Sequence, residues 1–301
     1  METAGLINYI KTTENNVVPL KVASGIQGVS FFSKLPRSFQ DVIVKRSGKS
    51  NPYMSFVVEP YSTFLAFEIV DFAVAERLLP SGYTLLPSSL FGNGKERPCA
   101  IIGAINVHTS LFWGSRLEFY LIAENKQTGL LSWIIATYET NTSSYDPNRG
   151  FIGATTEHCV ITTSYRGEVI VDVKSAQTSD HMSYVADISH ARPASMNERL
   201  WIEGNLSVDY GGDLQKSSDP FGLIFDPKEV QQGLMIAPED VTISLNTYGQ
   251  DFLDPKPFEA AYFPYAQHFM TTSFPVATPL TNADDLEREV AKLSESFPVL
   301  W

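Results

Sequence analysis

Short apolar runs, rich in β-branched and aromatic residues and separated by turn sequences, dominate residues 55–175. Runs of this kind are typical of β-strands. The strands they predict cover residues 56–58, 64–70, 100–107, 117–123, 130–138, 159–165 and 168–173. In the last of them the odd positions are valine and the even side becomes polar, which predicts a strand with one buried face.

The turns between these runs carry residues that tight hairpins require. Asn93-Gly94 can supply the positive φ angles of a two-residue turn. Lys126–Gly129 and Arg166-Gly167 each join two apolar runs at hairpin distance. These turns favour antiparallel neighbours.

Two segments have a helical pattern instead. Residues 74–79 form one or two turns that Pro80 ends. Near the C-terminus, residues 283–297 place Leu286, Val290, Leu293 and Phe297 on one stripe. We expect this stripe to pack against the body of the protein or against a second subunit.

The predicted fold is mainly β, a β-rich α+β class. We expect an antiparallel β-barrel or cone-like sheet with a few peripheral helices, one of them the amphipathic C-terminal helix. We expect residues 1–301 to form a single elaborated domain, with its core at about 55–175. Residues 176–280 hold many prolines and read as strands joined by irregular loops.

The composition and net charge of the chain argue against some classes of binding partner. The chain of 301 residues carries a net charge of -12 and is 44% hydrophobic, so it can build a large core. Acidic side chains outnumber basic ones, and the Lys and Arg residues do not form a dense cluster. Because contacts with phosphates require such a cluster, we expect no nucleic-acid partner. Since the sequence has no apolar run of about 18 residues and no signal-peptide pattern, we expect no membrane partner and a cytoplasmic location.

Common cofactor and metal motifs do not occur. Cys99 and Cys159 lack CxxC spacing and lie in apolar stretches, so we expect buried free thiols. The five histidines show no HxH or HExxH pair, and no glycine-rich phosphate loop is present. We therefore predict neither a metal nor a cofactor.

The strongest chemical signal lies at Arg116–Ile122. Strand alternation places Arg116, Glu118 and Tyr120 on one face, and Leu117, Phe119 and Leu121 on the other. A polar triplet pointing into a barrel could hold a carboxylate or carbonyl ligand. The alternative is a solvent-facing strand side with an ordinary ion pair.

This region resembles the acetoacetate decarboxylase-like superfamily. Residues 72–82 are similar to the family's short helix that ends in a Leu-Pro step, and Arg116–Leu121 to its strand with an inward glutamate. Residues 129–135 resemble the paired strand after a glycine turn. Residues 148–156 resemble the segment where the decarboxylases carry an arginine followed by Gly-Phe-Pro-Lys. The resemblance covers about residues 55–175.

The chain departs from this family at the position that matters most. Decarboxylases of the family form a Schiff base through the lysine of the last segment, whereas this chain reads Ala154-Thr155-Thr156 and has no lysine between Lys126 and Lys174. The resemblance therefore implies the fold without the imine. It leaves Glu118 as the candidate acid or base, and Arg116 and Arg149 as candidate clamps for a carboxylate or enolate.

The predicted site has two groups of residues. The catalytic candidates are Glu118, Arg116 and Tyr120. The candidates for binding the substrate are Trp113, Trp133, Tyr138, Arg149 and Thr155.

Three functional hypotheses follow. The first is an enzyme of the lyase, isomerase or cyclase type, acting by acid–base chemistry on a small carbonyl- or carboxylate-bearing compound, such as a polyketide-like compound of secondary metabolism. The second is a non-catalytic protein that binds a small hydrophobic ligand. The third is a structural or interaction protein that docks a partner through its C-terminal helix. The expected partners are a small molecule and a second copy in a homo-oligomer.

Overall fold

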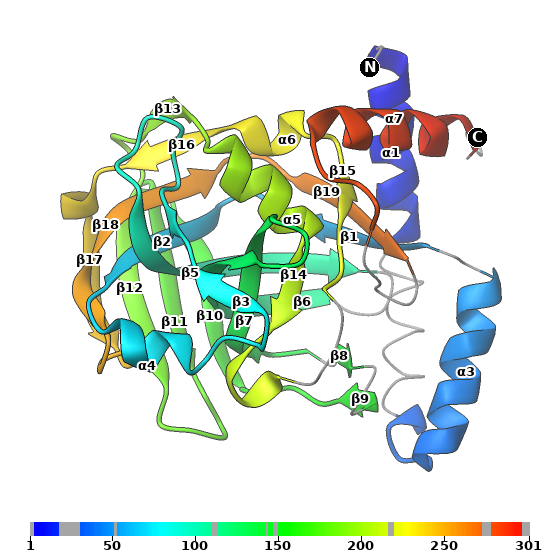
Figure 1. Ribbon diagram of the computed structural model, residues 1–301, viewed down its shortest axis with the longest axis horizontal. Coiled ribbons are helices and arrows are strands. Elements are labelled where there is room, and N and C mark those ends of the chain that lie inside the picture. The colour runs from blue at the N-terminus through cyan, green and yellow to red at the C-terminus, as the bar shows by residue number, and fades with distance from the viewer. Residues whose placement is uncertain are drawn as a thin grey trace.

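The computed structural model describes residues 3–17, 31–50, 53–109, 113–142, 144–146, 150–215, 220–272 and 278–296. The chain is mainly β, with a large mixed sheet, a second sheet and a few helices, which confirms the predicted fold class. All seven predicted strands are present to within a few residues. Figure 1 shows the sheets gathered in one body, with α1, α3 and α7 at its right-hand side.

The largest sheet has thirteen strands. They are β1 (Tyr53–Val58), β2 (Ser62–Ile69), β3 (Tyr83–Leu85), β4 (Pro87–Ser88), β5 (Arg97–Thr109), β6 (Trp113–Asn125), β7 (Leu131–Thr140), β13 (Arg192–Ser195), β14 (Val208–Tyr210), β15 (Ile224–Phe225), β16 (Gln232–Ile236), β18 (Leu253–Phe263) and β19 (Gln267–Thr272).

Two smaller sheets accompany it. The four-stranded sheet contains β10 (His158–Ser164), β11 (Glu168–Lys174), β12 (His181–Asp187) and β17 (Val241–Asn246). The two-stranded sheet pairs β8 (Ser144–Asp146) with β9 (Gly150–Ile152).

The helices are α1 (Thr3–Asn16), α3 (Arg37–Ser50), α4 (Phe72–Glu76), α5 (Gly204–Leu206), α6 (Lys228–Gln231) and α7 (Ala283–Ser296). A short π-helix occupies Arg199–Glu203, and single 3₁₀ turns occupy Gly212–Leu214 and Pro238–Asp240. The sequence pattern predicts α4 and α7 but misses α1 and α3. Both missed helices mix β-branched residues with polar ones, so their helix propensity is weak.

The thirteen-stranded sheet branches at β5. One edge of β5 pairs with β2 and, further along, with β1, while the other edge pairs with β6. One branch continues through β6 and β7 to β14, which runs parallel to β7. Among the described residues this pairing does not close into a barrel. The described strands form a branched sheet, so the barrel form of the predicted barrel or cone-like sheet is not seen in them.

Two apolar layers flank this sheet. One face of β5, β6 and β7 meets an aromatic cluster that includes Phe64, Trp133 and Trp201. The opposite face packs against the inner face of the four-stranded sheet, where Val169, Val171 and Val173 are buried as the alternation predicts. Side chains on β6 and β7 therefore face one of two distinct interiors, and on β7 the alternation changes phase at the irregularity between Ile135 and Thr137.

The C-terminal stripe packs within the chain. Leu286, Val290 and Leu293 of α7 are buried, and the last two contact Tyr9 of α1 and Met270 of β19 through one small core. The Tyr9 hydroxyl donates to the carbonyls of Ile224 and His268, at 2.9 and 3.0 Å. Phe297 lies outside the described residues. The predicted packing face is thus directed at the body.

The search for membrane-crossing segments covered the described residues. None of their helices has both the length and the apolar character that a membrane span requires.

Candidate active site

Strand β6 presents the predicted polar triplet on the aromatic side of the sheet. Tyr120 packs against the aromatic cluster, whereas Leu117, Phe119 and Leu121 belong to the other interior. The alternation therefore assigns the two faces correctly. Because the triplet faces the interior, a solvent-facing strand side is excluded: the side chains of Arg116 and Glu118 are only 11% and 10% exposed.

Glu118 is the centre of the triplet. Its Oε1 accepts a hydrogen bond from Arg116 Nε, and its Oε2 accepts one from the Tyr120 hydroxyl. The three residues alternate along one strand, so their side chains stand side by side. A buried carboxylate is stable only when it is paired and hydrogen-bonded, and both conditions are met here.

Arg116 keeps its charge in this environment. Burial alone would lower the pKa of the guanidinium, but the charge of Glu118, with smaller contributions from Tyr138 and Tyr210, raises it above the usual value. The Tyr138 ring lies beneath the guanidinium, with 4.0 Å from Arg116 Cζ to the ring centroid. Because β6 and β7 place Glu118 opposite Tyr138, the ring and the carboxylate act on the same cation.

Two donor nitrogens of Arg116 remain available. Among the described residues, the hydrogen bonds of Arg116 use Nε alone, and Nη1 and Nη2 have no protein partner. The paired N–H groups of a guanidinium match the two oxygens of a carboxylate. A buried arginine with this edge free is suited to an anionic ligand.

An aromatic floor supports the polar triplet. The Tyr120 ring packs edge-on against Trp133, with centroids 4.7 Å apart, and Trp133 lies 5.5 Å from Trp201. Trp133 is 4% exposed and donates its indole N–H to the Leu200 carbonyl at 3.0 Å. The Trp133 N–H is thus already used, so this residue shapes the site and cannot donate to a ligand through that group.

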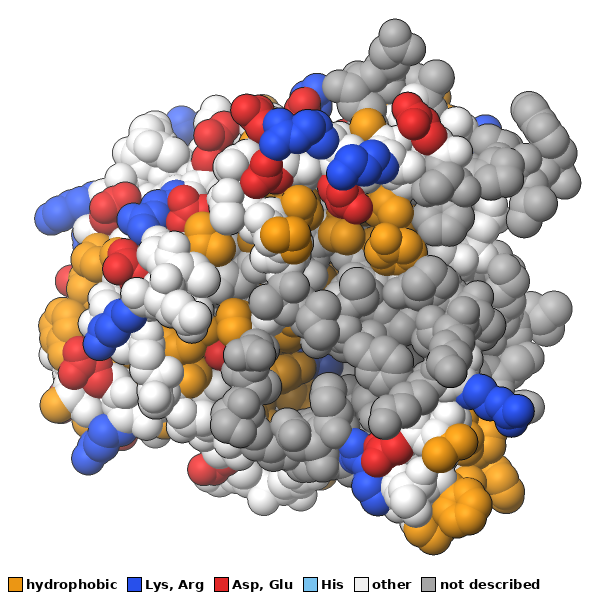
Figure 2. Space-filling model, turned by 45° about the vertical axis from the view of Figure 1, so that its right-hand side comes forward, with side chains coloured by type: hydrophobic (Ala, Val, Ile, Leu, Met, Phe, Trp, Pro, Cys, Tyr) orange, Lys and Arg blue, Asp and Glu red, His pale blue; other side chains and the backbone are white. Residues whose placement is uncertain are grey.

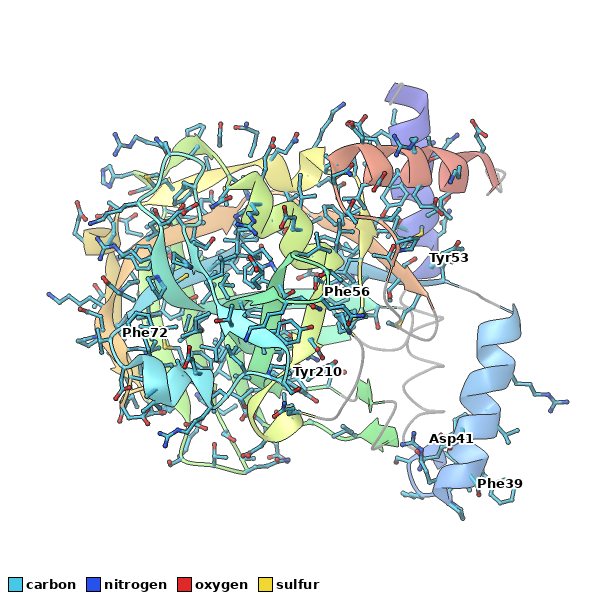
Figure 3. The ribbon with its side chains drawn as sticks, in the orientation of Figure 1. Phe39, Asp41, Tyr53, Phe56, Phe72 and Tyr210 are labelled. Atoms are coloured by element: carbon cyan, nitrogen blue, oxygen red, sulfur yellow. The ribbon has the colours of Figure 1, made fainter. Side chains whose placement is uncertain are left out.

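Tyr210 approaches the site from the loop-rich part of the chain, and the sequence analysis does not predict it. It lies on β14, paired with Ile135 of β7. The next two residues allow the close approach: a Cβ on Gly211 would lie 2.4 Å from the Leu78 carbonyl oxygen, and Gly212 has φ +54. Figure 3 labels Tyr210 near the middle of the body. The Gly211-Gly212 pair was the available signal.

Two other predicted binding residues, Trp113 and Thr155, make their described contacts away from the Glu118 carboxylate. Trp113 is 47% exposed and packs on His108, with ring centroids 4.0 Å apart. Its odd position on β6 directs it to the face opposite Arg116. Thr155 accepts a hydrogen bond from the Thr140 backbone N–H at 2.8 Å, which ties it to the end of β7. Arg149 lies outside the described residues.

A second buried acid, Glu139, follows Tyr138 on β7 but faces the other interior. It is 4% exposed and hydrogen-bonded to Thr155 and Ser175, while its Oε2 has no partner among the described residues. Burial raises its pKa. Strand alternation separates Glu139 from Glu118, so only one of the two acids can act with Arg116.

Metal-ligating groups were sought in the same described segments. In these segments no group of three or more His, Cys, Asp and Glu side chains could hold a metal ion. The functional groups brought together at this site are a guanidinium, a carboxylate and phenols.

The sequence matches no protein-family model and no curated protein. Among the solved structures that are similar to the chain are these two. The crystal structure of acetoacetate decarboxylase from Legionella pneumophila has 10% identity and a TM-score of 0.42, covering 73% of this chain and 84% of that chain. An acetoacetate decarboxylase-like enzyme from Sphingomonas wittichii RW1 has 10% identity and a TM-score of 0.40. The match covers 77% of this chain and 94% of that chain. Similarity at this level assigns neither a family nor an activity, and the chemistry has to come from the chain's own side chains.

Proposed function

We propose that the chain is an enzyme acting on a small carbonyl- or carboxylate-bearing compound by acid–base chemistry without an imine. The observation that carries the proposal is the buried contact of Glu118 with both Arg116 and Tyr120. Enzymes that move protons on carbon need a held carboxylate and a nearby cation that stabilises the developing negative charge. Arg116 and Glu118 supply both.

Each residue has a distinct role in this proposal. The Nη1 and Nη2 groups of Arg116 bind the carboxylate or the developing enolate oxygen of the substrate. Glu118 takes a proton from the carbon beside the carbonyl; the electrons of that C–H bond move to the carbonyl oxygen and form the enolate. The Tyr120 hydroxyl orients the carboxylate, and Tyr138 stabilises the arginine. Returning the proton to another carbon gives an isomerase, and expelling a group gives a lyase.

The lysine distribution supports chemistry without an imine. No lysine occurs between Lys126 and Lys174, a stretch that includes β7 and β10 and nearly all of β11. A Schiff base requires a lysine amine beside the substrate carbonyl. At the segment where the resemblance places that amine, the residue types are alanine and threonine.

A ligand-binding protein without turnover is the second candidate. Both oxygens of Glu118 already accept hydrogen bonds within the chain, so taking a proton from a substrate would require one of these bonds to be displaced. The aromatic floor would suit a hydrophobic ligand. A docking role for the C-terminal helix has less support, because α1 and the body already cover its apolar stripe.

A panel of 2-oxo and 3-oxo carboxylic acids in D₂O separates these candidates. Proton NMR would follow the loss of each C–H signal beside the carbonyl, and saturation transfer from protein to compound would report binding. Exchange faster than in the same buffer without protein supports the enzyme. Saturation transfer without exchange supports the binder, and the absence of both across the panel contradicts the proposal for this class of compound.

A further inference from the structure

Helix α3 stands apart from the sheets. Figure 1 shows it at the lower right, beyond the β-rich body, and β9 is the described element that it contacts most. Its polar Gln40 is 6% exposed and donates to the Leu35 carbonyl in the preceding turn at 2.9 Å. A helix in this position would normally turn its apolar side to the body.

The outward side of α3 and the turn before it is apolar. Phe31 and Phe39 are each 62% exposed, and Val42 is 59% exposed. Phe39 and Val42 are three residues apart and so share one helix face, which the exposed Arg46 continues. Hydrophobic side chains gather at this end of the molecule in Figure 2, and Figure 3 shows Phe39 pointing away from the body. Exposed aromatic and aliphatic groups on one helix face indicate an interface.

Charge separates this segment from the rest of the chain. Residues 31–50 hold five Lys and Arg residues and one Asp, a net charge of +4. Because the net charge of the whole chain is -12, the net charge of the remaining residues is -16. This local excess is too small for a nucleic-acid site, but its sign is opposite to that of the body.

We propose that α3 docks through Phe39 and Val42 on the acidic body of a second copy of this chain. A basic helix attracts an acidic surface, and two copies can exchange this contact about a two-fold axis. An anionic membrane would also attract the helix, but it would repel the rest of the chain, which carries a net charge of -16. The charge distribution therefore favours a second copy over a lipid surface.

Sedimentation velocity on the full chain at low salt tests this surface. The chain of 33.4 kDa should sediment as a dimer. The double variant Phe39→Ser/Val42→Ser should weaken the dimer about tenfold or more, as expected when central apolar contacts are lost. Arg46→Glu and added salt should also weaken it. Phe72→Ser, on α4 and 49% exposed, is the matched control and should leave the dimer unchanged.

Three results would overturn the proposal. One is a wild-type chain that stays monomeric at about 100 μM, well above the Kd of a specific dimer. Another is a dimer that the Phe39→Ser/Val42→Ser variant does not weaken. The third is a monomer that binds vesicles containing phosphatidylserine through the same two residues, which would assign the face to a membrane.

Discussion

The guanidinium of Arg116 lies over the ring of Tyr138, with Cζ 4.0 Å from the ring centroid. Because these residues come from neighbouring strands, the pairing of β6 with β7 builds the contact directly. The ring face carries negative charge density and stabilises the buried cation without using its N–H groups. Within the described part of the chain this leaves Nη1 and Nη2 available to a ligand while Nε holds Glu118.

Replacing Glu118 by leucine should destabilise the protein strongly. Arg116 would lose its counter-charge in a buried position, a change that costs about 3–5 kcal/mol of unfolding free energy. Urea denaturation measures this. The double variant Arg116→Met/Glu118→Leu should regain most of the loss, because no buried charge then lacks a partner. A Glu118→Leu protein as stable as wild type would contradict the buried ion pair.

Replacing Gly211 by alanine should disturb the approach of Tyr210. The new Cβ would lie 2.4 Å from the Leu78 carbonyl oxygen, so the loop after β14 must shift. We expect a loss of about 1–3 kcal/mol, as for overpacked interiors. Gly153→Ala is the matched control, since nothing lies within 4 Å of its Cβ. Equal melting temperatures for the two variants would show that the close approach is not required.

His268 should make the stability depend on pH. Its Nδ1 lies 2.8 Å from Glu229 Oε1, and its Nε2 lies 3.0 Å from Glu14 Oε1 on α1. Burial alone would lower the pKa of His268, but its hydrogen bonds and charge interactions with Glu229 and Glu14 outweigh this and raise it. The folded state therefore keeps a proton that the unfolded chain releases near pH 6.5.

This contribution is fully present below the unfolded pKa and is lost as the pH rises through the folded pKa. Unfolding free energies measured from pH 5.5 to 9 should therefore decline less in His268→Gln than in wild type. His190→Gln, whose side chain is 78% exposed, should keep the wild-type slope. Identical slopes in wild type and His268→Gln would rule out the coupling.

The two thiols should be unreactive in the folded protein. Burial raises the pKa of Cys159 to about 12, with a further contribution from the charge of Glu139, and burial raises the pKa of Cys99 as well. At pH 8 about one Cys159 thiol in 10,000 is then ionised, and the thiolate is the reactive form. Ellman's reagent should react slowly with native Cys99→Ala protein and rapidly after unfolding in urea. Rapid reaction of the native variant would contradict the burial.

Local periodicity was enough to predict that the three central residues of the proposed site share one buried strand face. Side chains alternate strictly along a strand, so the order Arg116, Glu118, Tyr120 already places three polar groups on one face. The same rule directs Trp113 to the face opposite Arg116, and its role in binding a substrate stays a prediction. The buried valines of β11 follow from the same periodicity.

Long-range placement could not be predicted in this way. Tyr210 reaches the site because β14 pairs in parallel with β7, far away in the sequence, and because Gly211 and Gly212 allow close contact. Nothing local to residue 210 specifies that partner. Helices α1 and α3 were missed for a different reason: both mix β-branched residues with polar ones, and α1 is fixed by tertiary contacts such as those of Tyr9.

Proton exchange in D₂O at the carbon beside the carbonyl, with a 3-oxo acid that binds the wild-type chain, tests the role of Glu118 most directly. Glu118→Gln keeps the size of the side chain and its acceptor oxygen but cannot take the proton. It should slow exchange by about 100-fold or more, while Glu124→Gln, on the same strand and partly exposed, should match wild type. Equal exchange rates for wild type and Glu118→Gln would contradict the assignment of Glu118 as the base.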